Sequence, residues 1–174
     1  MEITIKDSLK LIEESKEYEK FKQEHPNAEI CAGFFIIDFF GNDNKRSIDY
    51  KCDSDIFTCS LRDDDSIKVE QDKLIELKDV KLPELKTVNP DIKIDLDEVS
   101  SIARIKTLDE GISAKFSKII AVLQRYDHQG KDMQVWNLTC MLEGLIIIHM
   151  LIDAQTGDII KFERKSFMDM VKKK

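Results

Sequence analysis

Residues 133–162 form the longest apolar stretch of the chain, MQVWNLTCMLEGLIIIHMLIDAQTGDIIKF, and predict a three-stranded antiparallel meander. Within residues 135–142, the even-numbered positions are all apolar and the odd-numbered positions are mixed. This alternation is typical of a strand whose two faces have different surroundings. Residues 145–152 are rich in β-branched side chains and predict a strand that is buried on both faces. The polar turn at 153–158 then leads into a return strand at 159–162.

The first 70 residues predict one helix followed by antiparallel strands. Residues 6–24 carry an apolar stripe at helical spacing, and Asp7 or Ser8 is expected to cap this helix. The helix is expected to end before Pro26, because the residue before a proline avoids the helical region. Alternating or apolar runs separated by polar turns then predict strands at residues 28–40, 45–52, 56–61 and 67–70.

Residues 71–94 predict an extended connection that lies on the body of the protein, because prolines forbid a continuous helix and the leucines need burial. A second helix is predicted from Asp95 to about Glu110. Asp95 with Glu98 resembles a capping box, and Gly111 is expected to close or kink the helix. The remaining elements are a strand, a hairpin turn and, after the meander, a short last helix, predicted at residues 117–126, 127–130 and 166–174.

The predicted fold class is α+β, with helices packed on antiparallel sheet. Each half has the same order, a helix and then three or four strands, and therefore predicts two repeats of one unit. The halves share little residue identity, so the repeat is one of pattern. The predicted organisation is a first unit at residues 1–70, a connecting segment at 71–94 and a second unit at 95–174.

The composition is that of a globular protein with an acidic surface. Hydrophobic residues make up 42% of the 174 residues and charged residues 35%, so no extended disorder is expected. The net charge of -7 argues against a nucleic-acid partner, because non-specific binding to phosphates requires an excess of Lys and Arg. The only basic cluster, at residues 172–174, is expected to be a solvated tail.

Several features predict a cytoplasmic protein. Charged residues fill the first twenty positions, so no signal peptide is seen; secretion or an envelope location is the alternative if a leader precedes Met1. The apolar run 145–152 is far shorter than the roughly 20 residues that span a bilayer, so no membrane span is predicted. The four cysteines, which form no C-x-x-C pair, are expected to be free thiols, with a disulfide as the alternative: Cys31, Cys52, Cys59 and Cys140.

The second half resembles the PepSY-domain pattern over about residues 96–164. The shared features are a helix, a strand and hairpin, and then a strand, an Asp-Ala-x-Thr-Gly turn and a return strand, with matches at Trp136, Ile152, Asp153, Ala154, Thr156, Gly157 and Ile159. The resemblance implies a small helix on a curved antiparallel sheet, similar to cystatin-like folds. PepSY domains are associated with propeptides of secreted metallopeptidases, with peptidase inhibition and with regulatory envelope proteins. This sequence has no signal peptide, membrane span or attached peptidase domain, which favours a binding or regulatory module.

Five residues are candidates for binding a ligand or a partner: His149, Trp136, Tyr126, Phe35 and Phe39. His149 interrupts an apolar strand, and a buried imidazole needs a partner. It is therefore either a base or ligand-binding group in a pocket, or a histidine hydrogen-bonded to a neighbour or turned to a solvated face. Trp136 is expected either in the core or as an anchor in a partner surface.

Two pairs of adjacent aromatic residues, at 34–35 and 39–40, place one ring of each pair on the far side of the sheet from the helix. Such rings need a cover, which is expected to be residues 71–94, the sheet of the other half or a second subunit. The sequence therefore predicts a homodimer or a protein partner.

No motif pairs a nucleophile with a base, and no phosphate-binding loop, calcium loop or zinc pattern is present. No catalytic residue, metal or cofactor is predicted, and the chain is expected to be a non-enzymatic binding or regulatory protein. One alternative is a small-molecule-binding protein or small enzyme with a pocket between helix and curved sheet, which would use His149 or Tyr126. The other alternative is a peptidase inhibitor.

Overall fold

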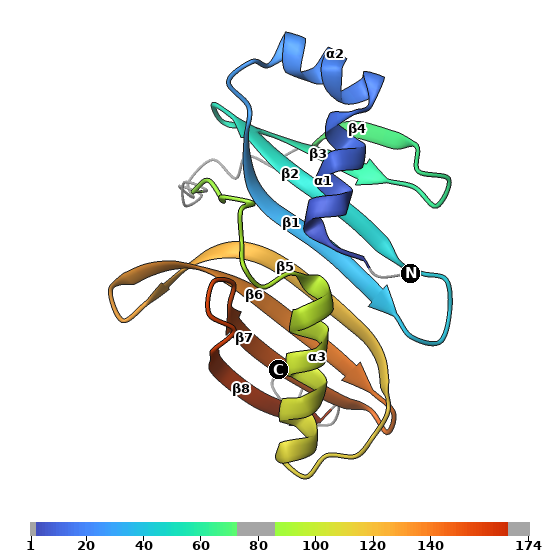
Figure 1. Ribbon diagram of the computed structural model, residues 1–174, viewed down its shortest axis with the longest axis vertical. Helices are drawn as coiled ribbons and strands as arrows, with labels where there is room; N and C mark the ends of the chain where they lie inside the picture. The colour runs from blue at the N-terminus through green and yellow to red at the C-terminus, as the bar shows by residue number, and fades with distance from the viewer. Residues whose placement is uncertain (1–2, 73–85, 167–174) are drawn as a thin grey trace, which may run out of the picture.

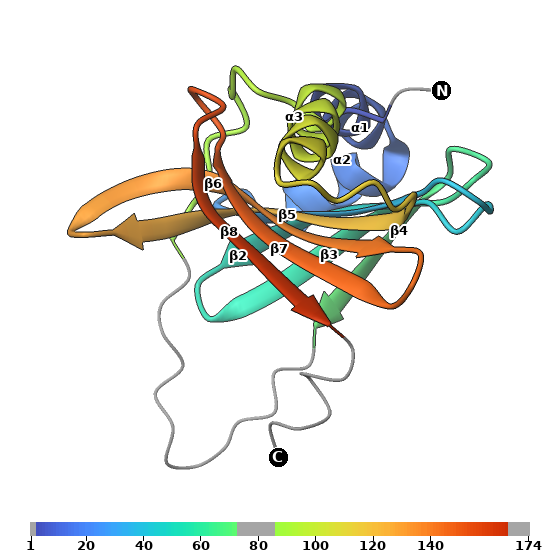
Figure 2. The same ribbon diagram turned by 90° about the horizontal axis from the view of Figure 1, so that it is seen from below.

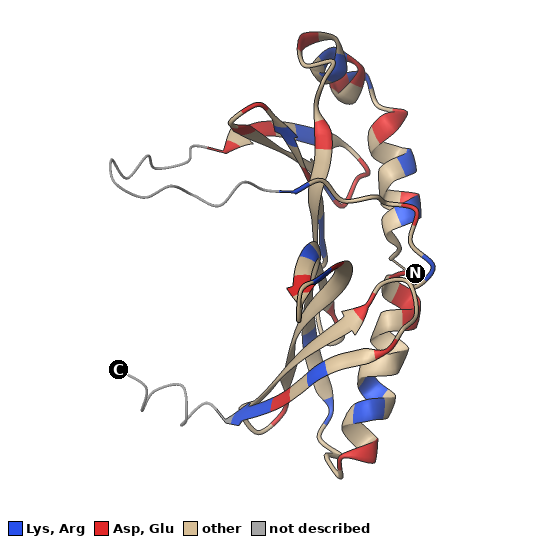
Figure 3. Cartoon of the chain, turned by 90° about the vertical axis from the view of Figure 1, so that its left-hand side faces the viewer, with Lys and Arg blue, Asp and Glu red and all other residues tan. Residues whose placement is uncertain are grey.

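One antiparallel sheet with helices on a single face forms the described part of the protein, residues 3–72 and 86–166 of a computed structural model (Figures 1 and 3). The strand order is β4-β3-β2-β1-β5-β6-β7-β8. The strands are β1 (Glu29–Asp38), β2 (Lys45–Cys52), β3 (Asp55–Leu61), β4 (Ile67–Asp72), β5 (Phe116–His128), β6 (Lys131–Leu142), β7 (Ile146–Asp153) and β8 (Ile159–Ser166). The helices are α1 (Ile5–Glu13), α2 (Lys16–Glu24) and α3 (Leu96–Asp109). The predicted α+β class and the antiparallel meander β6-β7-β8 are confirmed.

The two halves of the chain join edge to edge. Strand β1 pairs with β5 in antiparallel register, with Phe35 opposite Ala121, so a single sheet runs through the molecule. All three helices lie on the same side of that sheet (Figure 2). The sheet of one half therefore does not cover the outward aromatic residues of the other half, which removes one of the three predicted covers. Residues 73–85 of the predicted connection and 167–174 of the predicted last helix lie outside the described residues.

The main core lies between the sheet and the helices. Alternate residues of each strand face the helices, as Gly33 and Phe35 do in β1, and these positions are buried. The rings of Phe35 and Trp136 meet edge to face with their centroids 6.0 Å apart. Burial of one large apolar side chain stabilises a fold by roughly 1.5–3 kcal/mol, so this face holds the two halves together.

The helix predicted at residues 6–24 is wrong as a single element, because the chain breaks it at Ser15. Ser15 takes an extended conformation with φ -82° and ψ 152°, and its Oγ accepts a hydrogen bond from Tyr18 N at 3.1 Å. A serine side chain competes with the helical backbone in this way and is favoured as an N-cap. The first helix is also capped one turn earlier than predicted, by Thr4, whose Oγ1 accepts from Asp7 N.

Asp95 is the N-cap of α3, as the sequence predicts, but the predicted capping box is not formed. Its carboxylate accepts hydrogen bonds from Leu96 N at 2.6 Å and from Ile5 N at 2.7 Å. One buried side chain therefore serves the first turns of both α3 and α1. This contact between the helices was not predicted, because it joins residues that are 90 positions apart.

Two turns differ in how well the sequence predicts them. The β5–β6 hairpin turn has only two residues, Gln129 and Gly130, with φ 53° and 82°, so the predicted turn at 127–130 is too long. The β7–β8 turn is as predicted, with Gly157 at φ 80°. A Cβ atom at Gly157 would lie 3.3 Å from Cδ1 of Ile102 on α3, so close packing against the helix also favours glycine there.

Leu145, in the β6–β7 turn, has an unfavourable backbone conformation that burial does not offset. It has φ 59° and is 65% exposed, whereas the left-handed region costs an L-residue roughly 1–2 kcal/mol. We expect Leu145→Gly to raise the free energy of unfolding by about 1 kcal/mol in urea denaturation. Leu145→Asn should give a smaller gain, because asparagine tolerates this region better than leucine. A loss of stability in both variants would contradict the prediction.

Candidate functional site

Two of the five predicted site residues are in the core. Trp136 and Phe35 are both 0% exposed, and the indole Nε1 of Trp136 donates a hydrogen bond to Ile94 O at 2.8 Å. The core alternative for Trp136 is thus confirmed. The prediction of Phe35 as a partner contact is wrong, because its ring points toward the helices. The outward member of its pair is Phe34, which is half-buried.

Two other predicted residues lie on the face opposite the helices. His149 Nε2 lies 2.7 Å from Asn137 Oδ1, and His149 pairs across the sheet with Glu163. Partial burial lowers the pKa of His149, the positive charges of Lys161 and Lys165 lower it further, and Glu163 opposes them. Tyr126 stacks on His128 with ring centroids 6.2 Å apart, away from His149. His149 is thus hydrogen-bonded to a neighbour, and it lines neither of the two pockets described below.

The cysteines of the described residues are all free, and three of them are buried. Burial raises the pKa of Cys31 to about 11 and the pKa of Cys59 and of Cys140 to about 12. A thiol with a raised pKa is a poor nucleophile, because the thiolate is the reactive species. In the part of the chain that the structure describes, no three His, Cys, Asp or Glu side chains are grouped so as to hold a metal ion.

A pocket of about 320 Å³ lies beneath the C-terminal half of α3, between the end of β1 and the start of β5. We call it the α3 pocket, and its lining residues are Phe39, Phe40, Arg104, Thr107, Leu108, Ile112, Ala114, Lys115 and Phe116. Most of these side chains are apolar. Its volume is at the lower end of the roughly 300–1,000 Å³ found for small-molecule sites.

The way α3 ends builds one wall of the α3 pocket. Gly111 N donates to Leu108 O at 2.9 Å and Ile112 N donates to Thr107 O at 3.1 Å, with Gly111 at φ 80°. This pair of hydrogen bonds is a Schellman motif, in which a glycine in the left-handed region ends the helix. Gly111 therefore closes the helix, and the turn directs Ile112 back under it.

The opposite wall comes from aromatic residues that follow β1 and begin β5. Phe39 N donates to Ser117 O at 2.9 Å, which holds the end of β1 against the start of β5. The rings of Phe39 and Phe116 meet edge to face at 6.3 Å. The guanidinium carbon of Arg104 lies 5.2 Å from the centroid of the Phe39 ring, a favourable cation–π distance.

The mouth of the α3 pocket exposes large apolar side chains. Phe40 is 62% exposed and Leu108 is 63% exposed, and both line the pocket. Of the five predicted site residues, Phe39 alone lines it. The doubled aromatics at 39–40 were a usable signal, whereas nothing in the sequence distinguishes Leu108 from the buried apolar residues of its helix, and Arg104 had no signal at all.

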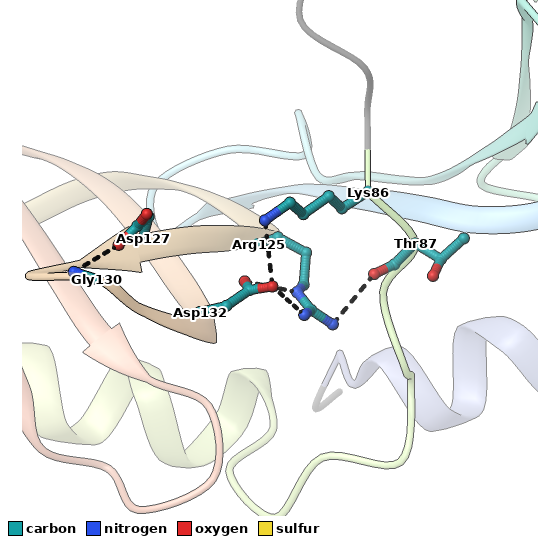
Figure 4. Close-up of polar contacts among 6 residues, drawn as sticks. All are labelled: Lys86, Thr87, Arg125, Asp127, Gly130 and Asp132. Atoms are coloured by element: carbon teal, nitrogen blue, oxygen red, sulfur yellow. Dashed lines mark hydrogen bonds and ion pairs between the residues drawn. The ribbon is translucent and has the colours of Figure 1, made fainter.

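A second pocket, of about 400 Å³, is lined mostly by polar residues, and two of its charged side chains, Arg125 and Asp132, pair with each other (Figure 4). Arg125 donates from Nη2 and Nε to the two carboxylate oxygens of Asp132, at 2.5 and 3.1 Å. Lys86 Nζ lies 3.2 Å from the same carboxylate, and Arg125 Nη1 donates to Thr87 O. This cluster ties the segment before α3 to the β5–β6 hairpin, so we assign it a structural role.

The contact with Arg125 shifts the pKa of Asp132, and this shift can be measured. Hydrogen bonding from Arg125 and then from Lys86 lowers the pKa of Asp132 to about 2. Because this folded-state pKa is depressed, the pair stabilises the fold above about pH 4, and its contribution is lost as the pH falls toward 2. We expect Arg125→Met to raise the pKa of Asp132 toward its ordinary value of 3.8 in a carbon-detected NMR titration. An unchanged pKa in Arg125→Met would contradict the assignment, and Lys131→Met is the control.

Comparison with known proteins gives a fold relationship only. No family model and no curated protein sequence matches the chain. The crystal structure of a "putative lipoprotein (CD1622)" from Clostridium difficile 630 is similar, with a TM-score of 0.59 over 84% of this chain and 89% of that chain. The sequence identity is 11%, so the similarity concerns the fold. None of the helices in the described part of the chain has the length and apolar character needed to cross a bilayer.

Proposed function

We propose that the protein is a non-enzymatic binding or regulatory protein of PepSY-like, cystatin-like architecture, and that the α3 pocket is its ligand site. The observation that carries the proposal is the open, mainly apolar pocket whose mouth exposes Phe40 and Leu108. Exposed apolar side chains that converge from separate segments on one concavity are typical of binding sites. The raised thiol pKa values and the hydrogen-bonded His149 favour binding over catalysis.

Two features support the architecture in this proposal. In each half, helix is followed by four antiparallel strands, as expected for two similar units. Several of the residues shared with the PepSY pattern also lie in one turn, and their contacts account for their types. Asp153 Oδ1 accepts from Gln155 N at 2.8 Å, and Ala154 is fully buried. Gly157 supplies the positive φ, so these residues form a turn whose role is structural.

Binding of a neutral apolar probe tests the proposed site. We expect N-phenyl-1-naphthylamine to bind with saturable fluorescence enhancement, because it would cover Phe40 and Leu108. Leu108→Asp should weaken this binding at least about tenfold, since it places a charge at the apolar mouth. Ile105→Asp is the matched control, because Ile105 is 60% exposed on the same helix and does not line the pocket. Equal binding by wild type and Leu108→Asp would rule out the α3 pocket.

A homodimer or a protein partner on the opposite face of the sheet is also proposed. Half-buried apolar residues face that side in the two central strands, namely Phe34 and Ile36 in β1 and Ile120 and Val122 in β5. Light scattering of the full chain over a concentration series would detect a homodimer. A monomer at all concentrations would leave only a different protein as the partner.

We propose a cytosolic location, supported by the four free cysteines, which are typical of a reducing compartment. The name of the structurally similar clostridial protein favours the cell envelope as the alternative. Fractionation of cells that express the native gene would decide between the two. Peptidase inhibition rests on the PepSY resemblance, and an assay against a panel of metallopeptidases addresses it.

A further inference from the structure

The charged side chains of the α3 pocket are both cations. Among the described residues, Arg104 and Lys115 are the only charged ones that line it, on a chain with a net charge of -7. A site that concentrates positive charge on an acidic protein is selective for anions, because the rest of the surface repels them.

These two cations also differ from their neighbours in having no acidic partner among the described residues. On α3, Lys106 forms an ion pair with Glu110 at 2.7 Å, and on β5, Lys118 forms one with Asp43 at 3.0 Å. Arg104 instead lies over the ring of Phe39, and no ion pair involves Lys115 in the described ranges. The nearby acidic side chains, Asp109 and Glu110 on α3 and Glu143 in the β6–β7 turn, do not line the pocket.

The C-terminal end of α3 opposes anion binding. The partial charge at this end can be compared with the charges of the two cations. A helix C-terminus carries the equivalent of about half a negative charge, which acts mainly within the last turn. Arg104 and Lys115 contribute two full positive charges. The pocket therefore remains net positive, and the apolar lining strengthens the interaction of these charges with a bound anion.

We propose that the α3 pocket binds a small apolar carboxylic acid, with the apolar part against Phe39, Phe40 and Leu108 and the carboxylate at Arg104 and Lys115. This inference rests on the proposed function and adds the class of ligand. The guanidinium carbon of Arg104 lies 5.2 Å from the centroid of the Phe39 ring, and Arg104 donates no hydrogen bond to another described residue, so its N–H groups are available for a two-pronged contact with a carboxylate. The volume of about 320 Å³ suits a medium-length acyl chain or a small aromatic ligand of two or three rings.

Displacement of N-phenyl-1-naphthylamine by three ligands of equal length tests the charge preference. Decanoate, decanol and decylammonium would be titrated into the full chain, below the micelle concentrations of the two ions and below the solubility limit of decanol. We expect decanoate to displace the probe at about tenfold lower concentration than decanol, and decylammonium to be the weakest. The advantage of decanoate should shrink as salt is added. Equal displacement by decanoate and decanol would overturn the inference and leave the apolar pocket standing.

Variants of Arg104 and Lys115 test whether these two side chains cause the preference for decanoate over decanol. The double variant R104Q/K115Q should lose the advantage of decanoate over decanol and still bind the neutral probe. Lys106→Gln is the matched control, since Lys106 lies on the same helix, does not line the pocket and should keep the full preference. Retention of the preference in the double variant would overturn the assignment to Arg104 and Lys115. Failure of the wild-type chain to bind the neutral probe would instead overturn the proposed function and this inference together.

Discussion

Replacement of Trp136 by alanine is expected to lower the free energy of unfolding by about 4 kcal/mol, within the range for deletion of a buried aromatic side chain. Trp136 is 0% exposed and packs edge to face on Phe35, so its removal leaves a cavity between α3 and the sheet. The loss also removes the hydrogen bond from its indole nitrogen to Ile94 O. Urea denaturation followed by far-UV circular dichroism measures the effect, because the variant has no tryptophan fluorescence.

Trp136→Phe separates the two contributions to this loss. Phenylalanine refills much of the volume but leaves the partly buried Ile94 carbonyl without its donor, which costs about 1 kcal/mol or more. We therefore expect Trp136→Phe to be about half as destabilising as Trp136→Ala. A loss below about 1 kcal/mol in Trp136→Ala would show that the ring does not support the join between the halves.

The second large effect is expected at Asp95, where alanine should cost about 3 kcal/mol. The side chain is 6% exposed, and its carboxylate accepts from the backbone of Leu96 and Ile5 and, at 3.4 Å, from Lys6. An ordinary N-cap contributes typically about 1 kcal/mol, and each buried donor left without a partner adds to the cost. Because Asp95 serves two helices, its loss affects α1 and α3 together.

Two variants define the role of the Asp95 carboxylate. Asp95→Asn keeps one acceptor oxygen and should lose roughly half as much stability, since asparagine is also a good N-cap. Asp97→Ala, in the first turn of the same helix, should cost only about 0.5 kcal/mol through the helix dipole. Thermal unfolding of the four chains in parallel measures these differences. Equal losses for Asp95→Ala and Asp97→Ala would contradict a shared cap.

Most of the local structure followed from patterns in the chain. The alternation in residues 135–142 predicts β6, and the glycine at 157 predicts the turn after β7. These patterns are reliable because each depends on neighbours a few positions away: side chains alternate along a strand, and only glycine enters the left-handed region without cost. The prediction of a single helix at residues 6–24 failed because local interactions also decide where a helix breaks. The hydroxyl of Ser15 offered a local alternative to the helix that an apolar stripe does not reveal.

The candidate site was harder to predict, because its parts come from different segments. Phe39 and Phe40 follow β1, Arg104 and Leu108 lie on α3, and Lys115 precedes β5. The pairing of β1 with β5 and the closure of α3 at Gly111 bring these segments together. Before that pairing is known, the exposed Leu108 cannot be distinguished from the buried apolar residues of its helix, and Arg104 resembles any surface cation.

The sequence by itself determined the α+β fold class, the approximate limits of nearly all described strands, and the acidic net charge. These properties depend on periodicity, turn chemistry and net charge, all of which are local or summed over the chain. Only the folded arrangement could assign Trp136 and Phe35 to one core, give Asp95 two helices to cap, and turn separate aromatic and basic residues into a pocket. Contacts of that kind depend on which strands pair, a choice made by burial over the whole molecule.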